Sequence, residues 1–303
     1  MQKNRPHHSR PIRWMTACLL CLGLLPLWAQ AMPGLWQAQK DGQRLWLLGS
    51  IHVGTADLYP LDAAIMQAWQ QADELILETD LRQLDGATQQ ELLQLGRLPA
   101  GQRLADKLPA PLYRQTVAAA QRQHLPAEAL LPLQPWFAAL TLTQVAMQQA
   151  GYQAQYGVDE YFVHQAETSH KPIVGLEQPI AQFRYLAGLK DHEVEFLQNT
   201  LEQLPSLSEL LPELIQAWQA GNTQSLVALL NEEQGPPALR DYLEAQLLAR
   251  RNQAWLPQLM DGQRHPNAFV VVGALHLHGP KGLLALLEQA GYAVTPLAAE
   301  ATP

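Results

Sequence analysis

The sequence predicts an α/β fold (or its α+β variant), built on a central mixed β-sheet flanked by helices. Short apolar runs of strand length alternate with segments whose apolar residues recur at helical spacing. The two ends of the chain repeat one pattern, an apolar run followed by Gly-x-x-His, at 44–52 and 268–276. The long middle is dominated by helical spacing. We therefore expect two related halves joined by a large helical region.

The first 31 residues have the pattern of a secretory signal peptide. Four basic residues precede the apolar segment 15–28, and Ala29-Gln30-Ala31 is a small-x-small cleavage site. The apolar segment is short for a membrane span. We expect cleavage after Ala31 and a periplasmic or secreted protein, with an uncleaved N-terminal anchor as the alternative.

Removal of this segment changes the charge and the cysteine content of the chain. The formal net charge of −8 becomes −12 when the four basic residues are lost. Both cysteines, Cys18 and Cys21, are lost as well, which excludes disulfides and thiol chemistry. An acidic chain without a basic cluster is not expected to bind nucleic acid. No other segment has the length and apolarity of a transmembrane span, and the oligomeric state stays open.

The first predicted element is a β-hairpin. Asp41-Gly42 separates two apolar-rich runs, and Asp-Gly in that position is typical of a tight hairpin turn. A helix with helical apolar spacing follows, and then a buried strand that ends in a carboxylate, Glu78. The expected strands of this part are 34–39, 44–52 and 74–79, and the expected helix is 61–71.

Between about 81 and 260 we expect a helical insertion within a single domain that spans 32–303. One short strand, 172–177, interrupts it and ends in Glu177. Because helices connect the strands, we expect mostly parallel pairing. The expected helices are 90–95, 111–123, 135–149, 156–166, several between 179 and 230, and one over 236–260; strand 267–273, helix 279–289 and strand 292–297 complete the chain.

Four polar residues stand at or just beyond the carboxyl ends of predicted strands, namely His52, Glu78, Glu177 and His276. In open α/β sheets this edge is where ligands bind. Two imidazoles and a carboxylate from separate strands suit a divalent metal with one open position, which would activate bound water. We therefore predict that His52, Glu78 and His276 bind Zn²⁺, Mn²⁺ or Co²⁺. No short metal signature is present, and a structural histidine is the alternative for either histidine alone.

The remaining candidates surround this set. Glu177 is the candidate general base, and Arg251 is expected to stabilise developing negative charge, with a solvated helix face as its alternative. Asp159 is a catalytic candidate, although helix capping explains it on chemistry alone. The candidate substrate-binding residues are Asn252, His278 and Ser50.

Taken together, the motifs resemble the TraB/GumN family (TraB/PrgY/GumN), which includes the Tiki proteins. The blocks follow family order and cover essentially the whole mature chain. The family typically has Thr where this chain has Ser50, a conservative difference. The matching blocks are Leu47-Leu48-Gly49-Ser50-Ile51-His52-Val53-Gly54, Leu58-Tyr59-Pro60-Leu61, Glu78-Thr79-Asp80, Gly157-Val158-Asp159, Gly175-Leu176-Glu177, Arg251-Asn252 and Val272-Gly273-Ala274-Leu275-His276-Leu277-x-Gly279.

The resemblance implies hydrolysis. Tiki proteins are regarded as metal-dependent proteases whose paired Gly-x-x-His motifs and a glutamate form the active centre, which corresponds here to His52, His276 and Glu78. The core is also similar to that of erythromycin esterases, in which His and Glu residues act without an obvious metal. Bacterial members are mostly uncharacterised, and some are linked to peptide-pheromone shutdown or to polysaccharide gene clusters, so the substrate stays open.

We therefore predict an exported hydrolase, a metal-dependent peptidase that acts on peptide or small-molecule substrates and needs no organic cofactor. Two alternatives stay open. One is a metal-free, esterase-like hydrolase that uses a His/Glu pair. The other is a non-catalytic protein that sequesters a peptide in the same cleft.

Overall fold

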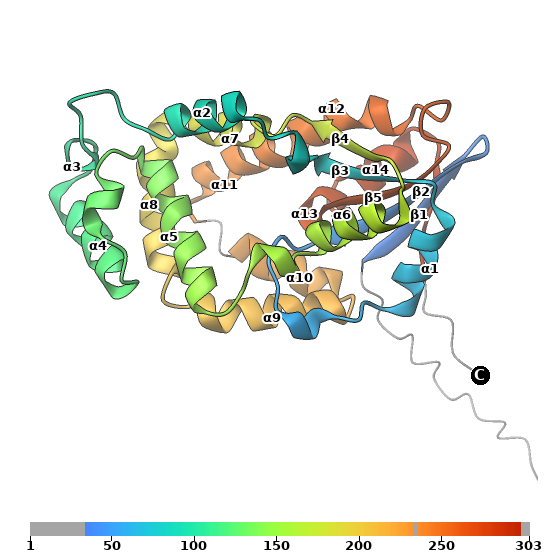
Figure 1. Ribbon diagram of the computed structural model, residues 1–303, viewed down its shortest axis with the longest axis horizontal. Helices are drawn as coiled ribbons and strands as arrows, with labels where there is room; N and C mark the ends of the chain where they lie inside the picture. The colour runs from blue at the N-terminus through green and yellow to red at the C-terminus, as the bar shows by residue number, and fades with distance from the viewer. Residues whose placement is uncertain (1–33, 233–234, 298–303) are drawn as a thin grey trace, which may run out of the picture.

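The sheet contains six strands and is mixed, as the sequence predicts. The computed structural model describes residues 34–232 and 235–297, so the expected signal peptide, 1–31, lies outside the described residues. The strand order is β4-β3-β5-β2-β1-β6 (Figure 1). Strands β4, β3, β5 and β2 are parallel neighbours, whereas β1 pairs antiparallel with both β2 and β6. The strands are β1 Leu35–Lys40, β2 Gln43–Ser50, β3 Glu74–Thr79, β4 Ile173–Glu177, β5 Asn267–Gly273 and β6 Ala293–Pro296.

The predicted hairpin joins β1 to β2. Asp41 and Gly42 both have positive φ, at 49° and 88°. A two-residue turn of this kind matches the right-handed twist of the strands on either side, and it requires residues that tolerate positive φ. The hairpin fixes the register of β2, whose carboxyl end leads into the Gly-x-x-His segment.

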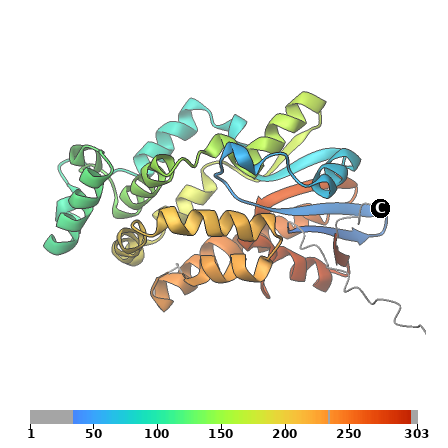
Figure 2. The ribbon, with the colours of Figure 1, turned by 90° about the horizontal axis from the view of Figure 1, so that it is seen from below.

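Helices cover both faces of the sheet (Figures 1 and 2). One apolar cluster packs Trp46, Leu75 and Phe269 of the sheet against one group of helices, and the other packs Leu45, Ile76 and Val270 against a second group. Alternation of side chains along each strand produces these two cores. The helices over the first face are α1 Ala63–Gln71, α6 Val158–Ser169, α9 Leu207–Gln219 and α10 Thr223–Glu232; those over the second are α12 Arg250–Leu259, α13 Ala274–Leu277 and α14 Leu283–Gln289.

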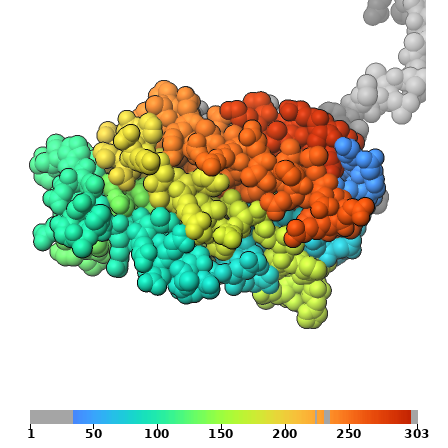
Figure 3. All heavy atoms as spheres, turned by 90° about the horizontal axis from the view of Figure 1, so that it is seen from above, coloured from blue at the N-terminus to red at the C-terminus, as the bar shows by residue number. Residues whose placement is uncertain are grey.

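The interval between β3 and β5 is helical apart from β4, and part of it forms a separate helical end of the molecule (Figures 1 and 3). This end has its own apolar cluster, which includes Leu104, Ala120 and Leu142. Among the described residues, no helix has the length and apolarity needed to cross a membrane. The remaining helices are α2 Gly86–Leu95, α3 Leu104–Lys107, α4 Ala110–Arg122, α5 Pro135–Gln149, α7 Ala181–Ala187, α8 Glu193–Gln203 and α11 Pro237–Leu243, with 3-10 turns η1 Ala56–Leu58, η2 Leu81–Gln83, η3 Ala127–Leu130, η4 Ala154–Tyr156 and η5 Lys190–His192.

Two helices differ from their predicted form. The long helix expected over 236–260 is interrupted by a π-helical segment, η6 Glu244–Ala249, between α11 and α12. The helix expected over 279–289 begins only at Leu283, because Gly279 has a φ of 84° that an α-helix does not accommodate. The chain instead forms the short helix α13 directly after β5, and α13 carries His276.

Candidate active site

The four polar residues predicted at strand ends meet at one edge of the sheet. The parallel strands β2, β3, β4 and β5 end side by side, as the register of their pairing requires. Gly273 marks the meeting point, since a Cβ placed there would lie 3.1 Å from Oε1 of Glu78, 3.4 Å from Nε2 of His52 and 3.7 Å from Cδ2 of His276. Glu177 joins the group through Arg251. The predicted convergence of the two Gly-x-x-His segments is therefore present.

Arg251 lies at the centre of the buried part of this group, with only 5% of its surface exposed. Nε and Nη2 donate to Glu177 at 3.0 and 2.7 Å, and Nη2 also donates to Oε2 of Glu78 at 2.5 Å. Nη1 donates to the carbonyl of Leu247 and to Nε2 of His276, both at 3.0 Å. All five N–H groups of the guanidinium are thus engaged. An oxyanion would have to replace one of these partners, and the predicted role of Arg251 at an oxyanion stays a prediction.

Glu78 is buried and receives three kinds of donor. Oε1 accepts the backbone N–H of Gly273 at 2.6 Å, and Oε2 accepts Nε2 of Gln182 at 3.0 Å as well as Arg251. Burial by itself would raise the pKa of Glu78, but His276, the Arg251 guanidinium and His52 outweigh it and lower that pKa to about 2. Glu78 is therefore an ionised carboxylate whose orientation is fixed from three sides.

Glu177 is held on the same side of Arg251. Its two oxygens accept Nε and Nη2 of Arg251, and Oε2 also accepts the indole N–H of Trp255 at 3.3 Å. Burial raises the pKa of Glu177, against the opposing influence of Arg251. With both oxygens engaged, Glu177 orients Arg251 in this state, and the predicted general-base role stays a prediction.

His276 is a neutral imidazole with a defined tautomer. Asn252 donates its Nδ2 hydrogens to the carbonyls of His276 and Lys281, so its Oδ1 accepts from Nδ1 of His276 at 2.7 Å. Arg251 can only donate, so Nε2 of His276 is the acceptor. Burial lowers the pKa of His276 to about 4, which agrees with a neutral ring. Asn252 therefore positions His276, and its predicted contact with substrate stays a prediction.

His52 differs from the buried group because 63% of its side chain is exposed. Nδ1 lies 3.0 Å from Oδ2 of Asp159, in the first turn of α6. The charge of this carboxylate is the main cause that raises the pKa of His52 to about 9. Asp159 is not a capping residue, since Gly157 occupies the N-cap position. Nε2 of His52 has no hydrogen-bond partner among the described residues, and it lies on the side of the ring that faces Gly273.

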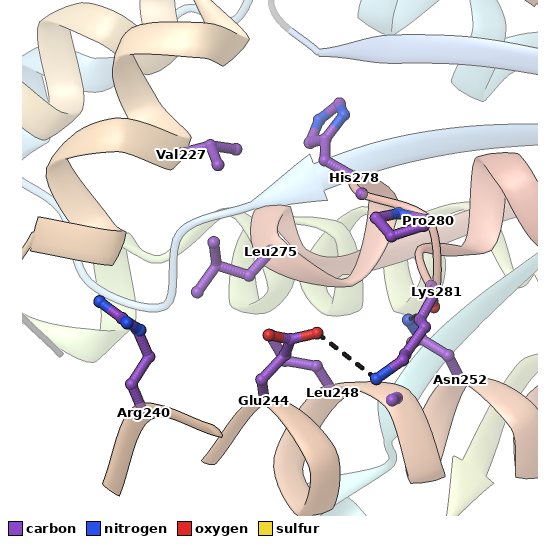
Figure 4. A pocket seen from close by; sticks show the side chains of 11 residues that line it. Val227, Arg240, Glu244, Leu248, Asn252, Leu275, His278, Pro280 and Lys281 are labelled. Atoms are coloured by element: carbon purple, nitrogen blue, oxygen red, sulfur yellow. Dashed lines mark hydrogen bonds and ion pairs between the residues drawn. The ribbon is translucent and has the colours of Figure 1, made fainter. Parts of the chain in front are cut away.

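Ser50 and His278 occupy different surroundings. Ser50 pairs with Gly273 in the register of β2 and β5, and its Oγ is buried without a hydrogen-bond partner among the described residues. His278 lies against the ring of Trp36, at 6.2 Å between centroids, and lines a separate cavity (Figure 4). Ser50 therefore lies beside the centre, whereas His278 does not join it.

A divalent ion does not fit the predicted three-ligand set as these residues are arranged. Nε2 of His276 accepts a hydrogen from Arg251, and Nδ1 carries the proton donated to Asn252, so neither ring nitrogen is open. An ion beside Glu78 would also meet the charge of the Arg251 guanidinium. Within 34–232 and 235–297, no group of three His, Cys, Asp or Glu side chains is arranged to hold a metal ion. The ligand roles of His52, Glu78 and His276 stay predictions.

Two contributors to the centre were missed from the sequence. Gln182 reaches Glu78 from α7, and Trp255 reaches Glu177 from α12, with its ring 4.5 Å from that of His276. Trp255 is one turn beyond Arg251 on the same helix, and that i, i+4 spacing is the signal that would have linked them. For Gln182 the sequence offers no comparable signal, because its contact crosses from one helix to a distant strand.

The fold and the site together define an α/β protein with a His-Glu-Arg centre at the carboxyl edge of a mixed sheet. The chain matches the TraB/PrgY/gumN family over residues 34–296 and belongs to that family. It is similar to "Uncharacterized protein YbaP" of Escherichia coli (strain K12) and of Shigella flexneri, each 29% identical over 243 residues, or 80% of this chain and 86% of the relative. No solved structure gives a significant match.

Proposed function

We propose that this protein is a hydrolase that cleaves an amide or ester bond, with His52 as the proton-transfer residue. The observation that supports it is the convergence of an open imidazole nitrogen and an ionised carboxylate oxygen over Gly273. Asp159 holds the other nitrogen of the same imidazole. A nucleophile-activating base oriented by a third group is the usual arrangement of hydrolytic sites.

In the proposed reaction, a water molecule between His52 and Glu78 attacks the substrate carbonyl. Nε2 of neutral His52 takes one proton from this water, while Oε1 of Glu78 accepts a hydrogen bond from the other O–H and so orients the water. The resulting tetrahedral adduct collapses when the C–N or C–O bond breaks, and His52 returns the proton to the leaving amine or alcohol. Asp159 stabilises the imidazolium that forms between the two steps. General base catalysis of this kind contributes about 10²- to 10⁴-fold in rate.

The buried residues maintain the geometry of this reaction. Arg251 fixes Glu78 and His276 at once, and Asn252 fixes the ring of His276 from the other side. No chemical step is assigned to a metal ion, because His276 has no open nitrogen in this arrangement. The proposal therefore follows the metal-free alternative, and metal dependence becomes an outcome of the test.

The test is an assay of the purified protein on libraries of fluorogenic peptides and aryl esters. We expect turnover that survives EDTA and falls at least about 100-fold in His52→Gln and in Glu78→Gln. His164→Gln, an exposed histidine on α6, is the matched control and should retain activity. Equal turnover in wild type and His52→Gln would overturn the proposal.

Two further outcomes separate the rival functions, and a third concerns the substrate. Activity that is lost in EDTA and restored by Zn²⁺, Mn²⁺ or Co²⁺ would favour the metal-dependent peptidase. Binding of a peptide without turnover would favour the sequestering protein. Preference for peptides over esters would narrow the substrate class.

We also propose export to the periplasm or the medium. The supporting observation is the basic, apolar and small-x-small succession that ends at Ala31. Mass spectrometry of the protein from its native host should find Met32 as the first residue. An intact N-terminus in the cytoplasmic fraction would contradict export.

A further inference from the structure

A cavity lies on the far side of Asn252 and α13 from the candidate centre. Its volume is about 350 Å³, at the lower end of the range of about 300–1,000 Å³ found for small-molecule sites. Figure 4 shows Val227 and His278 on one side of the cavity, with Arg240 and Glu244 facing them. His52 and Glu78 are not among the residues that line it.

The charges in this cavity are unbalanced. Lys281 pairs with Glu244 at 3.7 Å, and both side chains are about half exposed. Arg240 forms no side-chain hydrogen bond or ion pair with another residue of the described chain. The positive charge of Arg240 is therefore not neutralised within the cavity, and a ligand with a single negative charge would neutralise it. A dianion would meet the nearby carboxylate of Glu244, which disfavours phosphate monoesters.

Apolar side chains complete the lining. Val227 on α10, Leu248 on η6 and Leu275 on α13 face the cavity from three elements (Figure 4). Planar guanidinium groups recognise carboxylates through two parallel N–H donors. A ligand with a carboxylate at Arg240 and an apolar tail against these three side chains would match both the charged and the apolar residues of the lining.

The π-helical segment η6 explains why Glu244 and Arg251 face different sides of the same helix. With about 3.6 residues per turn, a regular α-helix would put Arg251 two turns from Glu244 on the same face. The wider turns of Glu244–Ala249 rotate α12, so that Glu244 faces the cavity while Arg251 faces the catalytic centre. Such π-helical turns are rare and are frequent at functional sites.

We propose that this cavity is a second binding site, distinct from the catalytic centre, for a small apolar monocarboxylate. The carboxylate pairs with Arg240, and the tail packs on Val227, Leu248 and Leu275. Two sources share this chemistry, the C-terminal residue of a short peptide and a short fatty acid.

Isothermal titration calorimetry of the purified protein tests the proposal with matched probes. The probes are N-acetyl-alanyl-leucine and hexanoate, each beside its neutral amide. An acid that binds should have an affinity at least about tenfold higher than that of its amide. This corresponds to about 1.4 kcal/mol in binding free energy. Preference between the two acids identifies the source. Equal binding of acid and amide, or no binding of either acid, would overturn the proposal.

Variants locate the binding. Arg240→Gln should abolish the preference for acid over amide, and Val227→Trp should block both probes by filling the cavity. Arg250→Gln is the matched control, since Arg250 is exposed, pairs with Gln246 and does not line the cavity. His52→Gln should bind the acids unchanged, so failure of the hydrolase proposal leaves this result intact. Loss of binding in His52→Gln, or unchanged selectivity in Arg240→Gln, would contradict a separate site.

Discussion

Nη1 of Arg251 donates a hydrogen bond to Nε2 of His276 at 3.0 Å. This contact decides how the two Gly-x-x-His segments differ. The histidine of the first segment is exposed, and within the described part of the chain its Nε2 has no partner, whereas the histidine of the second is buried and hydrogen-bonded at both nitrogens. The repeated motif therefore supplies two different imidazoles, one exposed at the surface and one buried and hydrogen-bonded at both nitrogens.

Removal of Arg251 should destabilise the fold strongly. Arg251→Met leaves the buried Glu78 and the partly buried Glu177 without their partner, and breaking a buried ion pair in this way costs about 3–5 kcal/mol. The measurement is urea denaturation at neutral pH. Arg184→Met is the control, because its pair with Glu91 is exposed and is worth at most about 1 kcal/mol. Similar losses in the two variants would show that the buried network is not stabilising.

The strand-end residues were predictable from the sequence for a simple reason. Parallel strands end at one edge, so carboxylates and histidines that follow apolar runs meet there. The sequence pattern predicts one group that contains His52, Glu78, Glu177 and His276, and the structure brings these residues together. The pattern does not show which ring nitrogens are hydrogen-bonded, because their partners come from other elements.

The partners arrive through long-range packing that has no local signature. Asp159 reaches His52 from 107 residues away, and Arg251 reaches Glu78 from 173 residues away. The π-helical turn before Arg251 also escaped prediction, since the apolar spacing over 236–260 continues through it. Both misses concern orientation, whereas the sequence pattern carries information mainly about burial and period.

Replacement of Asp159 should shift the pH dependence of the reaction. Asp159 is the main cause of the raised pKa of His52, about 9, and a base must be neutral to accept a proton. Wild-type activity should therefore rise with pH towards 9. Asp159→Asn should move this rise to lower pH, towards the ordinary histidine value of 6.5.

An NMR titration of His52 checks the same shift without an activity assay. Glu160→Gln, the adjacent acidic residue on α6, is the control and should leave the titration unchanged. A titration of His52 near 6.5 in the wild type would contradict the role given to Asp159.

The stability of the protein should be greatest near pH 6.5. The pKa of His276 is lowered from 6.5 to about 4, so between these values the unfolded chain binds a proton that the native chain does not, and stability falls with falling pH. The pKa of His52 is raised from 6.5 to about 9. Its contribution is therefore fully present below 6.5 and is lost as the pH rises through 9.

Urea midpoints measured from pH 4 to pH 9.5 test both arms of this profile. The difference in free energy of unfolding between wild type and His276→Gln should shrink as the pH falls below 6.5. The reason is that the variant lacks the histidine whose lowered pKa makes the wild type lose stability in acid. The gap between wild type and Asp159→Asn should shrink as the pH rises towards 9. Parallel profiles in all three proteins would rule out these histidines as the source of the pH dependence.

A methyl group at Gly273 should reduce activity more than stability. The Cβ of Gly273→Ala would lie 3.1 Å from Oε1 of Glu78 and 3.4 Å from Nε2 of His52, in the space that the attacking water needs. Gly273 has a φ of −50°, which alanine accepts without strain. We expect turnover to fall at least about tenfold, while overpacking costs at most about 1–3 kcal/mol.

The matched control is Gly86→Ala, where a Cβ meets no atom within 4 Å at the first position of α2. That change should leave turnover intact and should raise stability slightly, because alanine favours the helix by about 0.5–1 kcal/mol. Turnover assays and urea denaturation on the three proteins separate the two effects. If Gly273→Ala retained full turnover, the space over Gly273 would not be where the reaction takes place, and the convergence of His52 and Glu78 there would be structural.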